Sequence, residues 1–420
     1  MYKNTMKRVA LIVLGLVLAS GTLVAKQYDF TYGQLFYKIT DAAKREVAVV
    51  PENSDYPYYN NEPTGAITIP ATVANGGNTY SVTSVGGGAF YGCTELTSIN
   101  IPNGVTKIEG STFYGCRRLT SINIPNSVKS IGHYAFKGCT GLTSITIPSS
   151  VKSIGESAFK GCTGLTSINI PNGVTKIENG TFSGCRELTS ISIPNSVTSI
   201  GRGAFFDCRR LTSINIPNSV KSIGHYAFED CSGLTSINIP SGITKIEGDT
   251  FLGCKGLTSI TIPNGVTSIG ERAFGWCRGL TSINIPNSVT SIGEDAFCKC
   301  SGLTSITIPS GVTKIENGTF QGCSGLTSIT LPSALDSIGS IGSEKIDSYD
   351  KGAFENCTRL TSINIPNGVR FVGKNTFKDC SGLTSITIPN GVTKIEYGTF
   401  SGCIYNHRTT KTNQKYPSVN

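Results

Sequence analysis

The sequence predicts a repeat solenoid, because one short unit recurs along most of the chain. The composition agrees, since a few residue types are abundant and others are nearly absent, as expected when one unit has been copied many times. The stretch LTSINIPNGVTKIEGSTFYGC from Leu96 returns as LTSINIPNSVKSIGHYAFKGC from Leu119, a period of 23 residues. The chain has 49 Gly and 15 Cys, but only 2 Met, 1 Trp and 3 His. Copies of one unit at a fixed period form a stack in which each copy packs on its neighbours.

Each unit contains one predicted strand and one predicted turn segment. The pair Ile99-x-Ile101 predicts a short strand with both side chains on one side. The following Pro102-Asn103-Gly104 predicts a turn that ends this strand. The spacing Phe113-x-x-Cys116-x-x-Leu119 predicts a helical or 3-10 turn whose apolar side chains face the isoleucines.

A single unit buries too little apolar surface to offset the entropy of ordering its residues, so its stability must come from adjacent units. We therefore predict a right-handed β-solenoid or horseshoe over residues 66–403, with about 14 turns of 23 residues. Short parallel strands are expected on one face, and short helical or 3-10 turns on the other. Extra polar residues near 340–351 interrupt the period, and we expect a surface loop there.

The two ends depart from the repeat. Basic residues Lys3, Lys7 and Arg8 precede the apolar run 9–19, which predicts a signal peptide over residues 1–25. A retained membrane anchor is the alternative. Residues 26–65 alternate strand-like segments with polar turns, which predicts a strand-rich N-terminal cap, or alternatively a separate binding module. Residues 404–420 form a polar, basic tail that we expect to be disordered.

The unit resembles that of the BspA-like, or treponemal-type, leucine-rich repeat surface proteins, which runs IPxxVxxIgxxAFxxCxxLxxIxIP. The resemblance covers about residues 66–403, and every fixed position is matched many times. It implies the leucine-rich-repeat fold. It also implies a secreted or cell-surface protein of host-associated bacteria or protists, with a role in adhesion to host matrix proteins and to other cells.

All cysteines except Cys298 fall at the same place in the repeat. Cysteines at one phase of adjacent turns would lie about 4.8 Å apart with parallel side chains, whereas a disulfide needs β-carbons about 3.8 Å apart and a twist near 90°. This favours buried free thiols, although disulfides stay open as an alternative. Cys298 takes the place of a polar residue, so we expect it to be exposed and reactive.

No arrangement of residues predicts catalysis. The histidines His133, His225 and His407 are far apart, and no Ser-His-acid or Cys-His set can be built from them. The cysteines run in single file, which does not form a metal-ligand cluster. We expect no enzyme activity, no cofactor and no metal.

The exposed surface of the strands holds the candidate binding residues. Two outward files are expected, one of serines and one mainly of asparagines, and basic residues vary just after each cysteine. The candidate partner-binding residues are Ser98, Asn100, Asn123, Asn169, Asn215, Asn238, Arg117, Arg118, Arg186, Arg209 and Arg210. A polar ladder bonded to itself, and arginines that are merely solvated, are the alternatives.

The formal net charge of +9 is spread along a long object, so no nucleic-acid-binding stripe is expected. We predict an exported or cell-surface binding protein, adhesin-like and monomeric, without a transmembrane segment once the signal is removed. Its partner would be a protein or glycan on another cell or in the extracellular matrix. The alternative is a passive structural solenoid, or one that coats ice or glycans with its Ser/Thr/Asn ladder.

Overall fold

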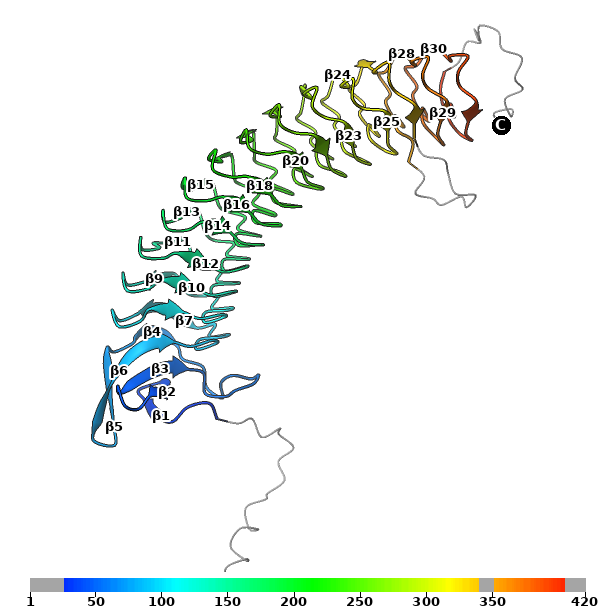
Figure 1. Ribbon diagram of the computed structural model, residues 1–420. Coiled ribbons are helices and arrows are strands. Elements are labelled where there is room, and N and C mark those ends of the chain that lie inside the picture. The colour runs from blue at the N-terminus through cyan, green and yellow to red at the C-terminus, as the bar shows by residue number, and fades with distance from the viewer. Residues whose placement is uncertain (1–25, 340–350, 405–420) are drawn as a thin grey trace, which may run out of the picture.

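The computed structural model describes residues 26–339 and 351–404. These residues form a single stack of about 13 turns that bends into an arc (Figure 1). The predicted repeat solenoid is confirmed. The predicted signal peptide, nearly all of the predicted 340–351 loop, and the tail from residue 405 onward lie outside the described residues.

The predicted Ile-x-Ile strands form one row of parallel strands, here called the front ladder. In the register of this ladder, Ser98 lies beside Ser121, Ile99 beside Ile122 and Asn100 beside Asn123. At Asn284 the ladder is reduced to an isolated bridge with Thr261. Its strands are β4 (Gly65–Thr68), β7 (Leu96–Asn100), β9 (Ser121–Asn123), β11 (Ser144–Ile145), β13 (Ser167–Asn169), β15 (Ser190–Ser192), β17 (Ser213–Asn215), β19 (Ser236–Asn238), β21 (Ser259–Thr261), β24 (Ser305–Thr307), β26 (Ser328–Thr330), β28 (Ser362–Asn364) and β30 (Ser385–Thr387).

A second row of parallel strands, the side ladder, was not predicted. After β6 its members have only two residues each, too few for a periodic hydrophobic pattern to be recognised. In β8, Lys107 is exposed and Ile108 is buried. The strands are β6 (Asn78–Val85), β8 (Lys107–Ile108), β10 (Ser130–Ile131), β12 (Ser153–Ile154), β14 (Lys176–Ile177), β16 (Ser199–Ile200), β18 (Ser222–Ile223), β20 (Lys245–Ile246), β22 (Ser268–Ile269), β23 (Ser291–Ile292), β25 (Lys314–Ile315), β27 (Ser337–Ile338), β29 (Phe371–Val372) and β31 (Lys394–Ile395).

The predicted helical or 3-10 turns are replaced by successive tight turns, and no helix occurs in residues 26–339 or 351–404. The backbone of Ser111 and of Gly115 is left-handed, with φ of 55° and 73°. In nearly every described turn, two left-handed residues at these positions prevent a helix from continuing. They also direct the N–H of Phe113 to the carbonyl of Ala135 in the next turn. This corner of the unit therefore adds hydrogen bonds between turns.

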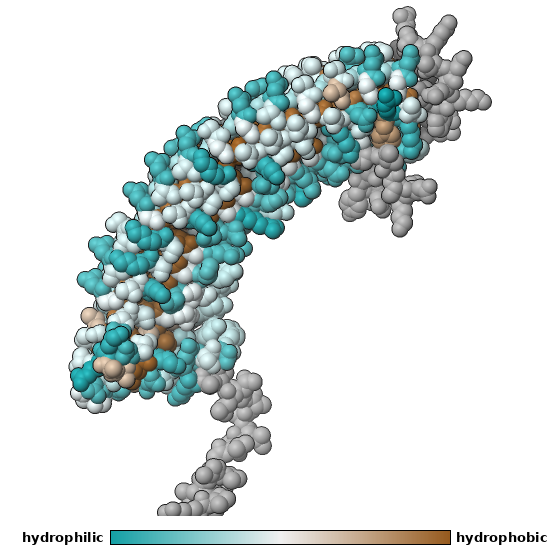
Figure 2. All heavy atoms as spheres, in the orientation of Figure 1, coloured by the Kyte–Doolittle hydropathy of each residue, from teal (hydrophilic) through white to brown (hydrophobic). Residues whose placement is uncertain are grey.

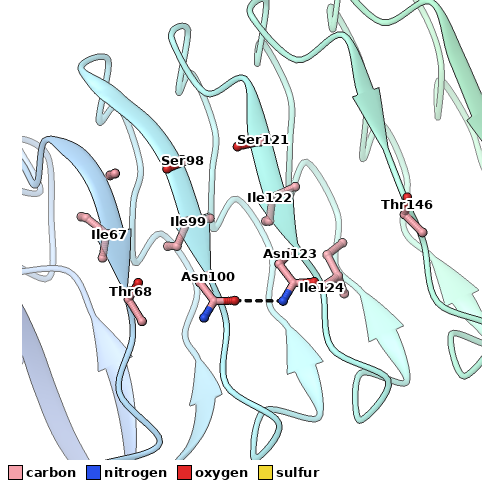
Figure 3. Close-up of a pocket in the computed structure, with 11 residues that line it drawn as sticks. Ile67, Thr68, Ser98, Ile99, Asn100, Ser121, Ile122, Asn123, Ile124 and Thr146 are labelled. Atoms are coloured by element: carbon pink, nitrogen blue, oxygen red, sulfur yellow. Dashed lines mark hydrogen bonds between the residues drawn. The ribbon is translucent and has the colours of Figure 1, made fainter.

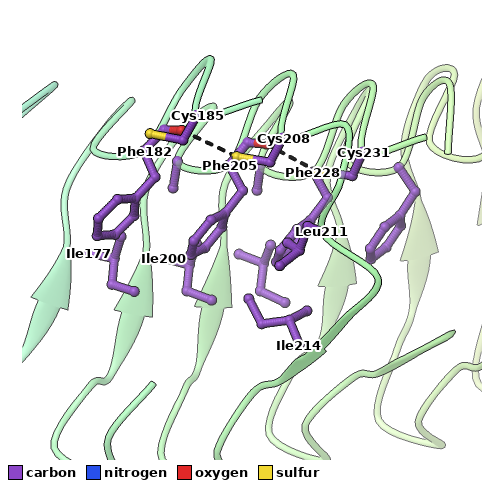
Figure 4. Packing of buried hydrophobic residues seen from close by; sticks show 14 of the residues in the cluster. Ile177, Phe182, Cys185, Ile200, Phe205, Cys208, Leu211, Ile214, Phe228 and Cys231 are labelled. Atoms are coloured by element: carbon purple, nitrogen blue, oxygen red, sulfur yellow. Dashed lines mark hydrogen bonds between the residues drawn. The ribbon is translucent and has the colours of Figure 1, made fainter. Parts of the chain in front are cut away.

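The core is a column of similar layers, one from each turn (Figure 4). One phenylalanine from each turn is stacked on the next from Phe90 to Phe400, with ring centroids 5.2 to 5.7 Å apart. The rings from Phe90 to Phe320 are fully buried, as are the leucines that open each unit, such as Leu211. Every layer depends on the layers above and below it for this burial.

The cysteines line this column as free thiols, and all except the half-buried Cys403 are buried. Each phased thiol from Cys116 onward donates a hydrogen bond to a phenylalanine carbonyl; that of Cys208, for example, reaches Phe182 over 3.2 Å. The prediction that Cys298 is exposed is wrong, because this residue is only 4% exposed. Its sulfur fills space beside Gly275, where a β-carbon would lie only 3.1 Å from it.

Because the thiols are buried, few of them should react with a thiol reagent in the native protein, while nearly all 15 should react after denaturation. Burial also raises the pKa of Cys298 to about 11, which lowers its thiolate fraction at neutral pH. Titration with a chromogenic disulfide, with and without denaturant, measures both numbers. Disulfides surviving in the denatured, unreduced protein would contradict this prediction.

The N-terminal residues extend the side ladder at its first end. Strands β1 (Phe30–Tyr32), β2 (Leu35–Asp41) and β3 (Glu46–Val50) are antiparallel, and β3 pairs with β6, which in turn pairs with β8. Strand β5 (Thr72–Asn75) forms a hairpin with β6. The ring of Tyr37 is fully buried in this region. We propose that residues 26–65 act as a cap for the stack.

Candidate interaction surface

The front ladder presents the predicted polar files to solvent. Asn100, Asn123, Asn169, Asn215 and Asn238 are exposed, and Ser98 is half-buried. The space-filling view has a mostly polar face, with hydrophobic atoms reaching the surface in a narrow row along the stack (Figure 2). The surface of the described strands is therefore a repetitive polar sheet with little apolar area.

Neighbouring turns of this sheet are joined by side-chain hydrogen bonds, mainly through a file of threonines that was not among the predicted binding residues. In many turns the threonine preceding the serine donates its hydroxyl to the threonine carbonyl one turn earlier, as Thr120 does to Thr97 over 3.1 Å and Thr166 to Thr143 over 3.1 Å. In the asparagine file, the amide of Asn123 donates to that of Asn100 over 2.9 Å (Figure 3).

A shallow depression, the front hollow, lies over the first turns of the front ladder (Figure 3). The ladder is interrupted here, since β9 ends one sheet and β11 begins another. The side chain of Ile122 is partly exposed, whereas Ile168 and Ile214 at the same register are each 5% exposed. The lining residues are Ala66, Ile67, Thr68, Ser98, Ile99, Asn100, Ser121, Ile122, Asn123, Ile124 and Thr146.

Three of the predicted arginines are brought together, but each has an acidic partner in the same chain. The guanidinium groups of Arg186 and Arg209 both bind the buried carboxylate of Asp207, over 2.8 and 2.5 Å. Burial opposes ionisation of Asp207, but these two hydrogen bonds outweigh it, and the pKa of Asp207 lies below its usual range. Arg210 pairs with Glu187 over 2.5 Å. The acids offset much of the positive charge expected there.

The other two candidate arginines lie near the first end of the stack. Arg118 pairs with Glu95 over 2.6 Å, and Arg117 is exposed. Asp207, which binds both Arg186 and Arg209, occupies a position of the repeat that is glycine in the preceding turn, at Gly184. This departure from the repeat was the signal in the sequence that could have identified it.

A second depression, the corner hollow, lies over the tight turns where two successive turns carry glycine, Gly180 and Gly203. On one side the guanidinium of Arg202 lies 4.7 Å from the ring centre of Tyr226. On the same side is Glu229, whose pKa is raised to about 7, chiefly by burial and further by Asp249 and Asp230, against the opposing charge of Arg272. Sequence reasoning missed Glu229 because burial and close neighbours set its properties.

Replacing Glu229 by glutamine should stabilise the protein above pH 7. The carboxyl is harder to ionise in the folded state than in the unfolded state, so its contribution to stability falls as pH rises from about 4.5 to about 7. After screening by solvent, we expect a gain of about 1 kcal/mol at pH 8 and little change at pH 4. Thermal unfolding at both pH values measures the difference.

The matched control is Glu187→Gln, which removes an exposed carboxylate that pairs with Arg210. It should change stability by less than about 0.5 kcal/mol, and in the unfavourable direction. Equal gains from both substitutions at pH 8 would indicate a general effect of net charge, and would contradict the specific role of Glu229.

Residues 26–339 and 351–404 contain no group of three or more His, Cys, Asp or Glu side chains placed to hold a metal ion. The same ranges contain no helix with the length and apolar character needed to cross a bilayer.

The chain was compared with protein families and with solved structures. The model for a BspA type leucine rich repeat region matches residues 55–188, 152–274, 244–344 and 344–417. A leucine-rich repeat protein from Bacteroides ovatus is 36% identical, with a TM-score of 0.79 over 90% of this chain and 93% of that chain. A leucine rich cell surface protein from Faecalibacterium prausnitzii is 31% identical, with a TM-score of 0.57 over 82% and 94%.

A leucine-rich repeat protein from Eubacterium ventriosum shares the fold, at 22% identity and a TM-score of 0.51 over 91% of this chain and 96% of that chain. The comparison with curated proteins gave no match. The ranges matched by the family model cover residues 55–417, and both of these more similar structures share the fold at more than 30% identity. This chain belongs to the family of BspA-type leucine-rich repeat proteins.

Proposed function

We propose that this protein is exported or displayed at the cell surface and acts as an adhesin-like binding protein. It recognises proteins or glycans of a host or of neighbouring cells through the repetitive surface of its solenoid. It acts without catalysis and as a monomer. The observation that carries the proposal is the long, polar front ladder, which offers small, uncharged polar groups at successive turns.

Two further observations support this function. The similar protein from Faecalibacterium prausnitzii is described as a cell surface protein, and it covers 82% of this chain. The basic start of the sequence and its apolar run 9–19 are typical of an export signal. A repetitive surface also suits a target that is itself extended or repetitive, because many weak contacts then add up.

A passive structural or ice- or glycan-coating role is the weaker candidate. It would rely on a regular ladder of free hydroxyl and amide groups. Hydroxyls of the threonine file, such as those of Thr120 and Thr166, are instead bonded to carbonyls of the preceding turn. The groups left for solvent are the serines and asparagines, whose file is broken by Thr146 and Ser192.

Pull-down with purified host matrix proteins and glycan arrays tests the proposal. Removing residues 186–254 joins Cys185 to Lys255 and keeps the 23-residue phase, so the shortened protein should still fold. If binding is distributed, this deletion should lower the affinity only in part, because the remaining turns still bind. A full-length chain with Arg186, Arg209 and Arg210 replaced by serine keeps its length and should bind almost as well. Loss of all binding in this triple variant would show a discrete arginine site instead.

A further inference from the structure

We propose that Trp276, Arg278 and Lys299, here called the tryptophan cluster, form a binding site for a sulfated glycan. The inference rests on the proposed binding function, and it names the class of one partner and the place where this partner binds. Trp276 is the one tryptophan of the chain, and its turn carries none of the arginines predicted to bind a partner.

The backbone position of Trp276 sets the cluster apart from the rest of the stack. This position, one residue before the phased cysteine, is left-handed in every described turn, with φ of 74° at Gly184 and 73° at Gly253. Elsewhere it is occupied by glycine, aspartate or asparagine, the residue types that adopt this conformation most readily. The exceptions are Trp276 and Lys299, in adjacent turns, with φ of 61° and 57°. Strained residues of this kind gather at binding and catalytic sites.

The two strained side chains contact each other and Arg278. The ammonium nitrogen of Lys299 lies 4.0 Å from the centre of the Trp276 ring, and the guanidinium carbon of Arg278 lies 4.9 Å from it. Both distances are within the range of an attractive cation–π interaction. The backbone N–H of Arg278 also donates to the carbonyl of Trp276 over 2.8 Å, which turns Arg278 back toward the ring. Two positive charges are therefore held beside one ring although they repel each other.

No acid neutralises these charges. Within residues 26–339 and 351–404, no carboxylate forms an ion pair with Arg278 or Lys299. Asp295, an acid of the same turn as Lys299, pairs instead with Lys351 over 2.5 Å. The arginines around Asp207 have their counter-charge within the chain. The tryptophan cluster does not, so it is the better place for an anionic group from another molecule.

The cluster offers the donors that a sulfate group accepts. The planar guanidinium of Arg278 can donate two parallel hydrogen bonds to the oxygens of one anionic group. Lys299 adds an ammonium group, and the indole N–H of Trp276 is a further donor. Lys255 occupies the repeat position of Arg278 one turn earlier and is exposed. It extends the positive charge along the stack, so that a second anionic group of the same ligand can be bound.

A sulfated glycan suits this arrangement better than an acidic peptide. Equivalent positions of adjacent turns, such as those of Lys255 and Arg278, are about 4.8 Å apart, whereas carboxylates on one side of an extended peptide recur at about 6.7 Å. The anionic groups of a sulfated sugar are fixed to one ring, so no flexible side chains have to be ordered on binding. The C–H groups of the sugar can also pack against the half-buried Trp276.

The experiment uses the chain from residue 26 onward and a fluorescein-labelled heparin hexasaccharide. Binding should change the emission of Trp276, and fluorescence anisotropy gives the affinity. Replacing Arg278 by serine and Lys299 by glycine together should weaken binding at least about tenfold, because both charged donors are lost. The repeat has these residues at the same positions in other turns, as at Ser301 and Gly322. Since glycine also relieves the backbone strain, the melting temperature should not fall.

The matched control removes the same charge from arginines that have acidic partners. Arg118 and Arg210 are exposed, and each pairs with a glutamate. Replacing both by serine should weaken binding less than about twofold, because these charges are already offset within the chain and screened by solvent. A chemically desulfated hexasaccharide and hexaglutamate serve as control ligands, and neither should compete with the heparin hexasaccharide.

Equal losses in the two double variants would mean attraction by net charge alone, and would overturn the proposal. So would equal binding of the desulfated hexasaccharide or of hexaglutamate, or an unchanged Trp276 emission at saturation. If the chain captures matrix proteins or other glycans but not the heparin hexasaccharide, this inference fails and the proposed function stands. If nothing binds in either assay, both fail.

Discussion

Replacing Phe205 by alanine should destabilise the protein by about 3–5 kcal/mol, the largest effect we expect from a single substitution. The ring is fully buried and stacked between Phe182 and Phe228, with centroids 5.6 and 5.3 Å away. Removing it leaves a cavity with no neighbouring side chain free to fill it. Since each turn is stabilised by its neighbours, the defect should also weaken the adjoining turns. Denaturant unfolding followed by circular dichroism measures the loss.

The adjacent residue provides the control. Phe206 is half-buried at the corner hollow, so Phe206→Ala has the same chemistry at the next position in the chain. This substitution should lower the free energy of unfolding by no more than about 1 kcal/mol, because the side chain of Phe206 buries little apolar surface. The fluorescence of Trp276, the one tryptophan, reports on a turn three units away and shows how far the defect spreads. Similar losses for both substitutions would contradict the importance of the ring column.

The parts of the fold that follow from repetition were predicted. Ile99 and Ile101 recur in phase along the chain, and both are buried as expected. The parts that depend on local backbone geometry were not. Ser111 and Tyr134 adopt left-handed conformations although neither residue type favours them, and the sequence gives no sign of this. The corner was therefore predicted as helical, and the side ladder was missed.

The surface was less predictable because its properties arise between turns. The outward position of the asparagine file follows from the alternation of side chains along a strand. That Asp207 binds Arg186, 21 residues away, depends on how the turns are aligned. The exposure expected of Cys298 was wrong for a similar reason, since its surroundings include Gly275 from the preceding turn. The pattern of a single unit does not show which non-consensus residues will contact each other between neighbouring turns.

Deleting residues 27–64 should make the protein aggregate, because it removes β1 to β3 while leaving β4 in place. Strand β6 would lose β3, and its unpaired N–H and C=O groups would become an edge on which other chains can add. The deletion also removes Tyr59, which is partly buried against the first turn and whose hydroxyl donates to the carbonyl of Ala89. Val82 and Val85, now fully buried, would lose cover.

A deletion within the stack separates loss of the cap from loss of length. Removing residues 186–254 takes away more of the chain, yet it keeps both ends and joins turns with the same register. That protein should stay soluble and fold, since it creates no new edge. Size-exclusion chromatography with light scattering compares the two deletions at equal concentration. A soluble, monomeric 27–64 deletion would show that the N-terminal strands form a separate module and that β6 protects the end of the stack by itself.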